Sequence, residues 1–264
     1  MTTGNPETGR RTPEEAFGRL LSIMNELREK CPWDKKQTIS SLRHLSIEEV
    51  YELADAILDG DMEKIKKELG DLLLHIVFYA KIASEERKFD ITGVINALCE
   101  KLIHRHPHIY GDVKVSGDED VKKNWEALKL KEGNESVLSG VPVSLPALVK
   151  AMRIQDKAKS TGFDWEHKED VWEKVKEEMQ EFLHAPPGEK KKEEFGDLLF
   201  SLVNYARFIS IDPEEALERT NKKFISRYKY MESSAKAAGK NMREMNPAEM
   251  DALWNEAKNL PGSI

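Results

Sequence analysis

Apolar residues recur at helical spacing along most of the chain of 264 residues. One face of the first such segment collects apolar side chains three and four positions apart, namely Phe17, Leu20, Leu21, Met24 and Leu27. Thr12 followed by Pro13 is typical of an N-cap with proline at the first helical position. The same spacing predicts an all-α protein with helices over residues 14–30, 40–59, 62–87, 92–105, 119–131, 148–159, 168–184, 190–209, 213–238 and 247–258.

Breaks in this pattern suggest two domains. Residues 1–12 are polar, and we expect them to be a disordered tail. A stretch rich in Gly, Pro and Ser at 133–146 is the best linker in the sequence. We therefore expect an N-terminal domain over 13–132 and a C-terminal domain over 147–264. Within the first domain, residues 109–115 could form a short extended piece.

A pattern of carboxylates occurs twice along the chain. Its first copy is Glu48-Glu49-x-x-Glu52 followed by Glu68-Leu69-Gly70-Asp71, and its second is Glu177-Glu178-x-x-Glu181 followed by Glu194-Phe195-Gly196-Asp197. Each copy runs directly into an apolar stretch, 72–80 or 198–206. Matched residues then follow in the same order, with Lys101, Arg105, Trp125 and Lys129 in the first half and Lys223, Arg227, Trp254 and Lys258 in the second. Internal duplication explains this order most simply.

The repeated acids have the spacing of a metal site. Carboxylates three residues apart lie on neighbouring helix faces, and two antiparallel helices would bring two such pairs together. Carboxylates that converge repel one another unless a cation neutralises them, and hard divalent ions such as Mg²⁺ take oxygen ligands. We expect Mg²⁺, with Mn²⁺ as a substitute, at Glu49, Glu52, Glu68 and Asp71 and at Glu178, Glu181, Glu194 and Asp197. Glu48 and Glu177 lie a helical step away, where either could orient a water or act as a general base.

Cations and aromatic residues complete a candidate polyphosphate site. The pairs Lys101/Arg105 and Lys223/Arg227 would bind outer phosphate oxygens. Aromatic faces stack on nucleobases, which makes Trp33, Trp125, Trp165 and Trp254 candidate platforms for a base.

Composition excludes several classes of protein. The net charge of −7 argues against a general nucleic-acid binder, which would carry a basic field. The two cysteines, Cys31 and Cys99, have no CxxC partner, so no disulfide framework is expected. No signal-peptide core and no run of about 20 apolar residues is present, which predicts a cytoplasmic protein without a membrane span.

Two other functions remain open at this point. A Glu-rich helix is commonly a solvated face, and Glu doublets also occur at Glu85-Glu86 and Glu214-Glu215, so the chain could be a helical scaffold. It could also be a nucleotide sensor that binds metal and triphosphate without aligning a water. The pairing of both acidic motifs, twice, favours the metal site.

Together these residues resemble the MazG family of nucleoside triphosphate pyrophosphohydrolases in its full-length, two-domain form, from about Glu14 to Lys258. The resemblance rests on the acids and on three strings, Cys31-Pro32-Trp33-Asp34-x-x-Gln37-Thr38, Arg105-His106-Pro107-His108 and Gly162-Phe163-Asp164-Trp165. One departure is Ile39, where the family often has His.

The resemblance implies two tandem helical bundles completed by dimerisation, and Mg²⁺-dependent hydrolysis of nucleoside triphosphates to monophosphate and pyrophosphate. It assigns metal binding in the second half to Glu178, Glu181, Glu194 and Asp197, with Glu178 also expected to be catalytic. The nucleotide would be surrounded by Lys174, Glu177, Lys190, Glu193, Lys223, Arg227, Trp254 and Lys258. The second domain is the expected catalyst and the first a weak or regulatory one, although the first keeps all of its acids.

Overall fold

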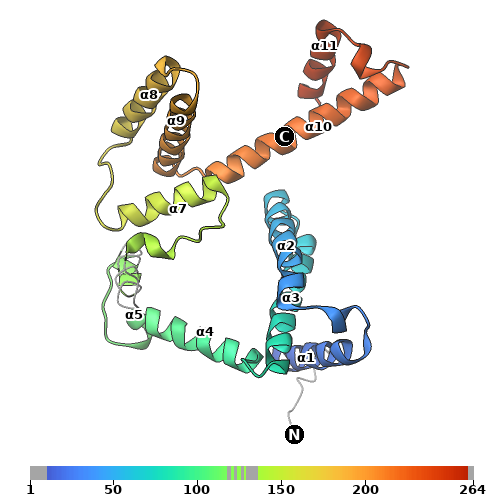
Figure 1. Cartoon of the computed structure of the whole chain (residues 1–264), viewed down its shortest axis with the longest axis vertical. Coiled ribbons are helices and arrows are strands. Elements are labelled where there is room, and N and C mark those ends of the chain that lie inside the picture. The colour runs from blue at the N-terminus through green and yellow to red at the C-terminus, as the bar shows by residue number, and fades with distance from the viewer. Residues whose placement is uncertain (1–10, 118–119, 122–123, 126–127, 129–135, 261–264) are drawn as a thin grey trace. The chain divides into compact units, whose positions relative to one another are not determined.

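The computed structural model describes residues 11–117, 120–121, 124–125, 128 and 136–260. Among these residues there are helices and turns but no strand, so the predicted all-α fold is confirmed. The chain divides into two compact units, Met1–Lys114 and Val115–Ile264. Each unit is described separately below, with its helices labelled as in Figure 1.

The first unit is built around a helical hairpin. Helices α2 (Ile39–Asp59) and α3 (Met62–Glu85) make the most extensive helix pairing of this unit, and α1 (Pro13–Lys30) packs against α3. Gly60 ends α2 with a φ of +68°, a left-handed conformation that glycine adopts without strain. Asp61 then caps α3 by accepting from the backbone N–H groups of Glu63 and Lys64. The chain continues into α4 (Ile91–Arg105) and α5 (Pro107–Tyr110).

The second unit repeats the hairpin with different surroundings. Helices α8 (Lys168–His184) and α9 (Glu189–Phe208) pair closely, and α7 (Ala147–Lys159) packs against α9. Gly188 precedes α9 with a φ of +116° and allows the sharp reversal after two prolines. The long helix α10 (Pro213–Ala237) then leads away from the hairpin to α11 (Pro247–Lys258), which folds back along the far end of α10 (Figure 1).

Most helix bounds predicted from the sequence agree with the structure to within two residues. The extended piece predicted at 109–115 is wrong at its start, because Pro107–Tyr110 forms a short helix. Proline favours the first turn of a helix since its φ is already helical. The predicted linker contains a 3₁₀ turn at Val137–Gly140. The predicted tail at 1–12 and helix at 119–131 lie largely outside the described residues.

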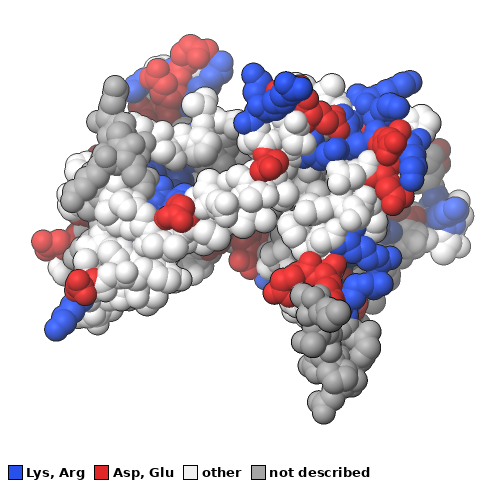
Figure 2. Space-filling view, turned by 90° about the horizontal axis from the view of Figure 1, so that it is seen from below, with Lys and Arg blue, Asp and Glu red and all other residues white. Residues whose placement is uncertain are grey.

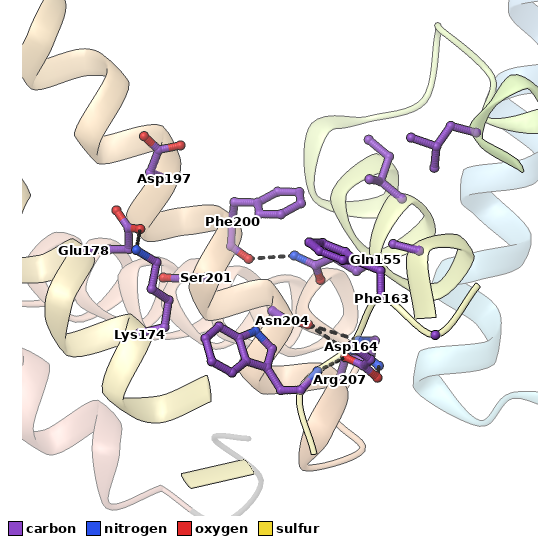
Figure 3. Close-up of a pocket in the computed structure, with 15 residues that line it drawn as sticks. Gln155, Phe163, Asp164, Lys174, Glu178, Asp197, Phe200, Ser201, Asn204 and Arg207 are labelled. Atoms are coloured by element: carbon purple, nitrogen blue, oxygen red, sulfur yellow. Dashed lines mark hydrogen bonds and ion pairs between the residues drawn. The ribbon is translucent and has the colours of Figure 1, made fainter. Parts of the chain in front are cut away.

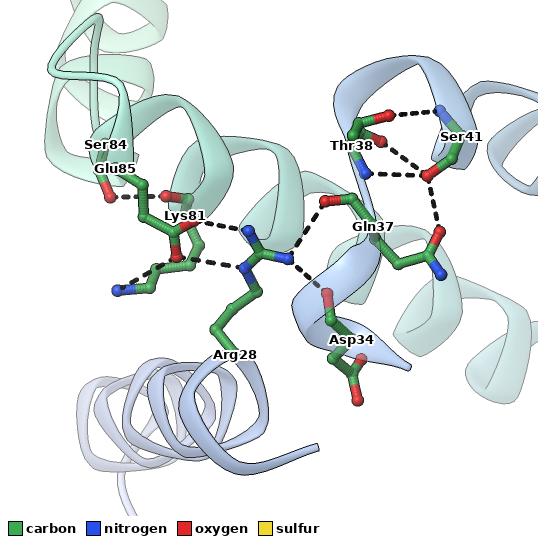
Figure 4. A network of polar contacts seen from close by, with 8 residues as sticks. All are labelled: Arg28, Asp34, Gln37, Thr38, Ser41, Lys81, Ser84 and Glu85. Atoms are coloured by element: carbon green, nitrogen blue, oxygen red, sulfur yellow. Dashed lines mark hydrogen bonds and ion pairs between the residues drawn. The ribbon is translucent and has the colours of Figure 1, made fainter. Parts of the chain in front are cut away.

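A compact apolar core holds the first unit together. Met24, Leu42, Val77, Phe78 and Ile82 form one buried cluster. The guanidinium of Arg28 lies 5.6 Å from the centre of the Phe78 ring. Figure 4 shows the same guanidinium donating to the backbone carbonyls of Asp34 and Gln37 and pairing with Glu85. Arg28 thus ties the loop between α1 and α2 to the end of α3.

Charges are mixed on the surface. Figure 2 shows acidic and basic side chains interspersed on the face in view, with wide uncharged areas between them. Among the described helices, none is both long enough and apolar enough to cross a membrane.

Candidate functional site

Three carboxylates meet between α8 and α9 in the second unit. Glu178, Glu194 and Asp197 each place an oxygen within 4.8 Å of the others. Glu178 and Glu194 are 7% and 5% exposed, whereas Asp197 is open to solvent. The antiparallel hairpin produces this meeting, because the inward face of α8 lies opposite the inward face of α9. Two buried acids side by side require a positive partner.

Two lysines provide part of that positive charge. Lys174 Nζ lies 2.8 Å from a carboxylate oxygen of Glu177 and 2.8 Å from one of Glu178. Lys190 Nζ lies 2.5 Å from Glu194. Hydrogen bonds to these acids raise the pKa of both lysines, and the bond from Lys190 lowers the pKa of Glu194. Both ammonium groups are therefore firmly charged and locally paired.

Glu181 lies at the edge of the same cluster. Its pKa is raised, first by desolvation and then by the negative charges of Glu178 and Glu194. The charges of Glu178 and Glu194 thus add to desolvation in disfavouring a further negative charge at this point. The donor set is entirely oxygen and includes no Cys or His. Such a set fits a hard divalent cation of the Mg²⁺ type.

A large pocket opens beside these acids. Its volume is about 790 Å³. In Figure 3, Glu178 and Lys174 stand on one side of it and Gln155 and Phe163 on the other, with Phe200 between them. Residues from the 3₁₀ turn at Val137–Gly140, α7, α8, α9 and the loop before α8 line the pocket, namely Leu138, Ile154, Gln155, Ala158, Gly162, Phe163, Asp164, Trp165, Lys174, Glu178, Asp197, Phe200, Ser201, Asn204 and Arg207. The size suits a small organic ligand adjoining a cation site.

The first unit carries the matching acids between α2 and α3. Glu49, Glu68 and Asp71 place oxygens within 4.8 Å of one another, and Glu68 is 1% exposed. Lys67 Nζ lies 3.1 Å from Glu68 and 3.3 Å from Asp71. The pKa of Glu49 is raised by burial and then by the charges of Asp71, Glu52 and Glu68. Both halves thus build a carboxylate cluster.

The two clusters differ in what lies next to them. Seven residues after the cluster aspartate, the second unit has Asn204 in the pocket wall, and the first unit has Phe78 in the apolar core. The cavity beside Met24 and Val77 in the first unit has a volume of only about 120 Å³, and none of the cluster acids lines it. The helix face that forms a pocket wall in one half is therefore packed core in the other.

Comparison with known proteins identifies the duplicated unit. A family model for the MazG nucleotide pyrophosphohydrolase domain matches residues 37–110 and again 166–231. The chain belongs to the MazG family. The nucleoside triphosphate pyrophosphohydrolase/pyrophosphatase MazG of Thermotoga maritima is 44% identical to it over 92% of this chain and 95% of its own length. The nucleoside triphosphate pyrophosphohydrolase of Escherichia coli K12 is 38% identical over 91% of this chain and 96% of its own length.

One solved structure gives a more limited likeness. A crystal structure of a mazG-related protein from Thermotoga maritima covers 43% of this chain and 98% of its own, with 30% identity and a TM-score of 0.39. The MazG assignment rests on the sequence matches.

The structure separates the residues that the sequence grouped into one MazG site. The acids, Lys174 and Lys190 come together, whereas a second group forms at the far end of the unit, where α11 packs on α10 (Figure 1). There the guanidinium of Arg227 lies 5.6 Å from the Trp254 ring, with Phe224 against the same ring. Four residues that were predicted to surround the nucleotide lie on these two helices, namely Lys223, Arg227, Trp254 and Lys258. In the first unit, Lys101 and Arg105 lie on the later turns of α4, which leads away from the hairpin (Figure 1).

The sequence pattern did not predict several residues of the pocket. Ser201 and Asn204 interrupt the apolar stretch 198–206, and this interruption was the available signal. Gln155 gave no signal, because a single glutamine in an amphipathic helix is usually solvated. Of the four tryptophans considered as base platforms, Trp165 lines the pocket.

Proposed function

We propose that this chain is a Mg²⁺-dependent enzyme that hydrolyses nucleoside triphosphates to nucleoside monophosphate and pyrophosphate, and that the second unit carries the reaction. The observation that supports it best is the meeting of Glu178, Glu194 and Asp197 beside a pocket of about 790 Å³. The names of the relatives with nearly full coverage point to the same reaction.

The acids of α8 and α9 would hold the metal. Glu178, Glu194 and Asp197 would be the central ligands, and Glu181, whose pKa is raised first by desolvation and then by the nearby charges of Glu178 and Glu194, would be the fourth carboxylate. When bound, Mg²⁺ polarises phosphate oxygens and favours deprotonation of water. Glu52, beside Glu49, Glu68 and Asp71, would be the equivalent carboxylate of the first unit.

The paired lysines would move from acids to phosphate. Lys174 and Lys190 pair with Glu178 and Glu194 here, and with these acids engaged as metal ligands both lysines would be free to donate to phosphate oxygens. Glu177, which now pairs with Lys174, would then be available as the general base for the attacking water. Glu193, which lies 3.7 Å from Lys190, would position that lysine. In the first unit, Glu48 would have the role that Glu177 has in the second.

The contrast between the units favours catalysis in the second. A triphosphate needs room for its nucleoside next to the metal, and the second unit offers that room. In the first unit Met24, Val77 and Phe78 fill the corresponding face as core. We infer that the first unit binds metal but turns over nucleotide weakly, as a regulatory domain would.

We also propose that the enzyme is a homodimer and that each copy supplies part of the other's site. Apolar side chains are exposed on two helices of the hairpin and on α10, namely Met179, Leu183, Phe195, Leu199, Leu202, Leu217, Phe224 and Ile225. A second copy would bury them and complete a four-helix arrangement. The same contact would carry Lys223, Arg227, Trp254 and Lys258 to the acids of the partner. By the internal repeat, Lys101 and Arg105 would act similarly toward the first cluster.

The reaction is tested with ATP and Mg²⁺ in ¹⁸O-labelled water. We expect AMP and pyrophosphate, with the label in AMP because the water attacks the α-phosphorus. Label in pyrophosphate would place the attack on the β-phosphorus, and release of ADP with orthophosphate would reject the proposed bond. Binding of ATP without any product would favour a nucleotide sensor instead.

The shared site is tested by mixing two inactive variants. Glu178→Gln removes a metal ligand, and Arg227→Ala removes a cation from α10. If sites are shared, heterodimers of the two contain one site with both residues intact, and the mixture regains part of the activity. No recovery after exchange of subunits, or a monomer by light scattering, would reject the shared site. Calorimetric titration with Mg²⁺ and Mn²⁺ tests the metal separately.

A further inference from the structure

One wall of the pocket lies outside the duplicated domain. The second match to the MazG model begins at residue 166 and contains the lining residues of α8 and α9. The lining residues from Leu138 to Trp165 all precede that match. In Figure 3, Gln155 of α7 stands across the pocket from Lys174 and Glu178. The chain therefore enters the second domain by way of the wall that faces its acids.

This wall starts with a short irregular segment, residues 136–146, which we call the strap. It opens with the 3₁₀ turn Val137–Gly140, which the Ser136 side chain caps by accepting from the backbone N–H of Leu138. The turn packs against α7, which begins directly after the strap. Leu138 lines the pocket and is 45% exposed. A half-exposed leucine in a pocket wall loses contact with water when a ligand covers it, which favours binding.

Lys150 ties the middle of the strap to α7. Its Nζ donates to the backbone carbonyl of Val143 at 2.5 Å. A carbonyl in an irregular segment has no partner from a helix ladder, and an ammonium group satisfies it with a charge-assisted hydrogen bond. Lys150 does not line the pocket itself. Any effect of this lysine on a ligand would therefore act through the strap.

Lys157 lies beside the turn of the strap. It is 4% exposed, which is unusual for a charged side chain. A methyl group added at Gly140 would lie 3.4 Å from Nζ and 3.7 Å from Cε of this lysine. Lys150 and Lys157 are two helical turns apart, so they share one face of α7. The strap follows that face, with Val143 at one lysine and Gly140 at the other.

We propose that the strap is a positioning element of the substrate site, held on α7 by Lys150 and Lys157 so that Leu138 completes the wall opposite the acids. The inference rests on the proposed function, because it concerns affinity for the same nucleotide. It extends the substrate site beyond the duplicated domain, to the segment that connects this domain with the first unit. The acids belong to α8 and α9, so the strap acts on substrate binding and not on the chemical step.

The anchor is tested with Lys150→Met, which keeps a side chain of similar length and removes the donor. Without ligand, hydrogen exchange of the strap amides, followed by mass spectrometry, should be faster than in wild type, because the Val143 carbonyl loses its partner. KM for ATP should rise about 3- to 10-fold and kcat should stay within about twofold, since only uniform binding is lost. Lys159→Met changes an exposed lysine of the same helix and is the matched control.

Leu138→Ala tests the wall contact. Loss of part of an apolar surface should raise KM for ATP about 3- to 10-fold with an unchanged kcat. The inhibition constant of pyrophosphate, which cations and metal would bind on the other side, should stay the same. Val143→Ala removes a 90% exposed side chain of the same strap that does not line the pocket, and it should leave KM unaltered.

A third measurement needs no variant. Mg²⁺ with a non-hydrolysable ATP analogue should slow hydrogen exchange of the wild-type strap, because a ligand in the pocket would cover Leu138. The corner between α3 and α4, at residues 86–90 of the first unit, does not line the pocket and should exchange at an unchanged rate.

Three results would overturn the proposal. One is the same strap exchange in wild type with and without the analogue. Another is a wild-type KM in both Lys150→Met and Leu138→Ala. The third is a fall in kcat at constant KM, which would place the strap in the chemical step. Unfolding temperatures from circular dichroism show whether each variant folds, and the wild-type exchange decides where one does not.

Failure of this inference differs from failure of the proposed function. If ATP gives AMP and pyrophosphate and both variants keep wild-type kinetics, the reaction stands and the strap is a connection alone. If no hydrolysis occurs, hydrogen exchange of the wild-type strap with and without AMP still tests its contact with a nucleotide. Equal exchange in the two states would reject that contact.

Discussion

Lys174 Nζ lies 2.8 Å from Glu178 Oε1, so a partly exposed ammonium neutralises a buried carboxylate one helical turn away. The same ammonium is shared with Glu177 at 2.8 Å. This arrangement keeps the acidic cluster stable without metal, and it holds a cation near the place where phosphate would arrive. The consequences for stability and activity can be measured separately.

Lys174→Met should destabilise the protein in the absence of divalent metal. Removal of the ammonium leaves Glu178 buried without its partner, which is unfavourable for a charged group. We expect a lower unfolding temperature in EDTA and a larger increase on addition of Mg²⁺ than in wild type, followed by circular dichroism. Lys176→Met is the matched control, because Lys176 pairs with the exposed Glu173 on the same helix. Equal behaviour of the two variants would contradict the prediction.

Glu178→Gln and Glu49→Gln should differ in their effect on turnover. Both replace a cluster carboxylate by an amide of nearly the same size, but only Glu178 lines the large pocket. Loss of a residue that hydrogen-bonds to a metal ligand lowers metal affinity or activity about 10- to 100-fold. Loss of the ligand Glu178 itself should therefore reduce kcat by more than about 100-fold. Glu49→Gln should keep most of the activity. A steady-state assay of pyrophosphate release measures kcat of both variants. A larger loss of kcat in Glu49→Gln than in Glu178→Gln would place catalysis in the first unit.

Asn204→Phe should close the pocket of the second unit. It places there the residue that the first unit has at the equivalent position, Phe78. The larger ring would occupy space needed by the nucleoside and lower kcat/KM for ATP by about 10-fold or more. Metal affinity, measured by calorimetry, should stay the same because the acids are untouched. Unchanged kinetics would show that the substrate does not use this part of the pocket.

Phe78→Ala should strongly destabilise the first unit. The ring is 3% exposed, packs with Met24 and Val77, and lies under Arg28. Truncation of a buried phenylalanine costs about 3–5 kcal/mol of folding free energy. Urea unfolding should show an early transition for the first unit and a later one for the second. A single transition at the wild-type midpoint would contradict the role of Phe78 in the core.

The Arg28–Glu85 pair should give part of the acid sensitivity of the first unit. Its hydrogen bonds lower the pKa of Glu85 below the ordinary value of 4.5. A carboxyl with a depressed folded pKa stabilises above its unfolded pKa and loses this contribution as the pH falls through the folded pKa. Glu85→Gln should therefore reduce stability at pH 7 more than at pH 3.5, measured by urea unfolding. An equal loss at both values would mean that the charge of Glu85 is not the cause.

The helical elements could be predicted from the sequence because their information is local. Apolar spacing, Thr12 before Pro13 and glycines at turns such as Gly60 each act within a few residues. Those signals placed most helix ends within two residues. The short helix at Pro107 was missed because four residues are too few for a periodic pattern.

The acids were predictable for a related reason. A spacing of three on a helix, repeated in two halves of the chain, indicates which carboxylates share a face. The structure brings Glu178, Glu194 and Asp197 together, with Glu181 at their edge, and metal binding by these acids stays a prediction. It leaves Arg227 and Trp254 with each other at the end of α10, and their approach to an acidic cluster stays a prediction that depends on the dimer.

By itself, the sequence determined that the chain is all-α, is internally duplicated and has two groups of carboxylates. Periodicity and spacing are local and do not depend on how the helices are arranged. Only the tertiary structure decided that Asn204 borders a pocket while Phe78 is core, and that Phe163 is held uncovered by the pairing of Asp164 with Arg207. The physical reason is that a cavity depends on how side chains from separate helices fill the space between them. No single segment contains that information.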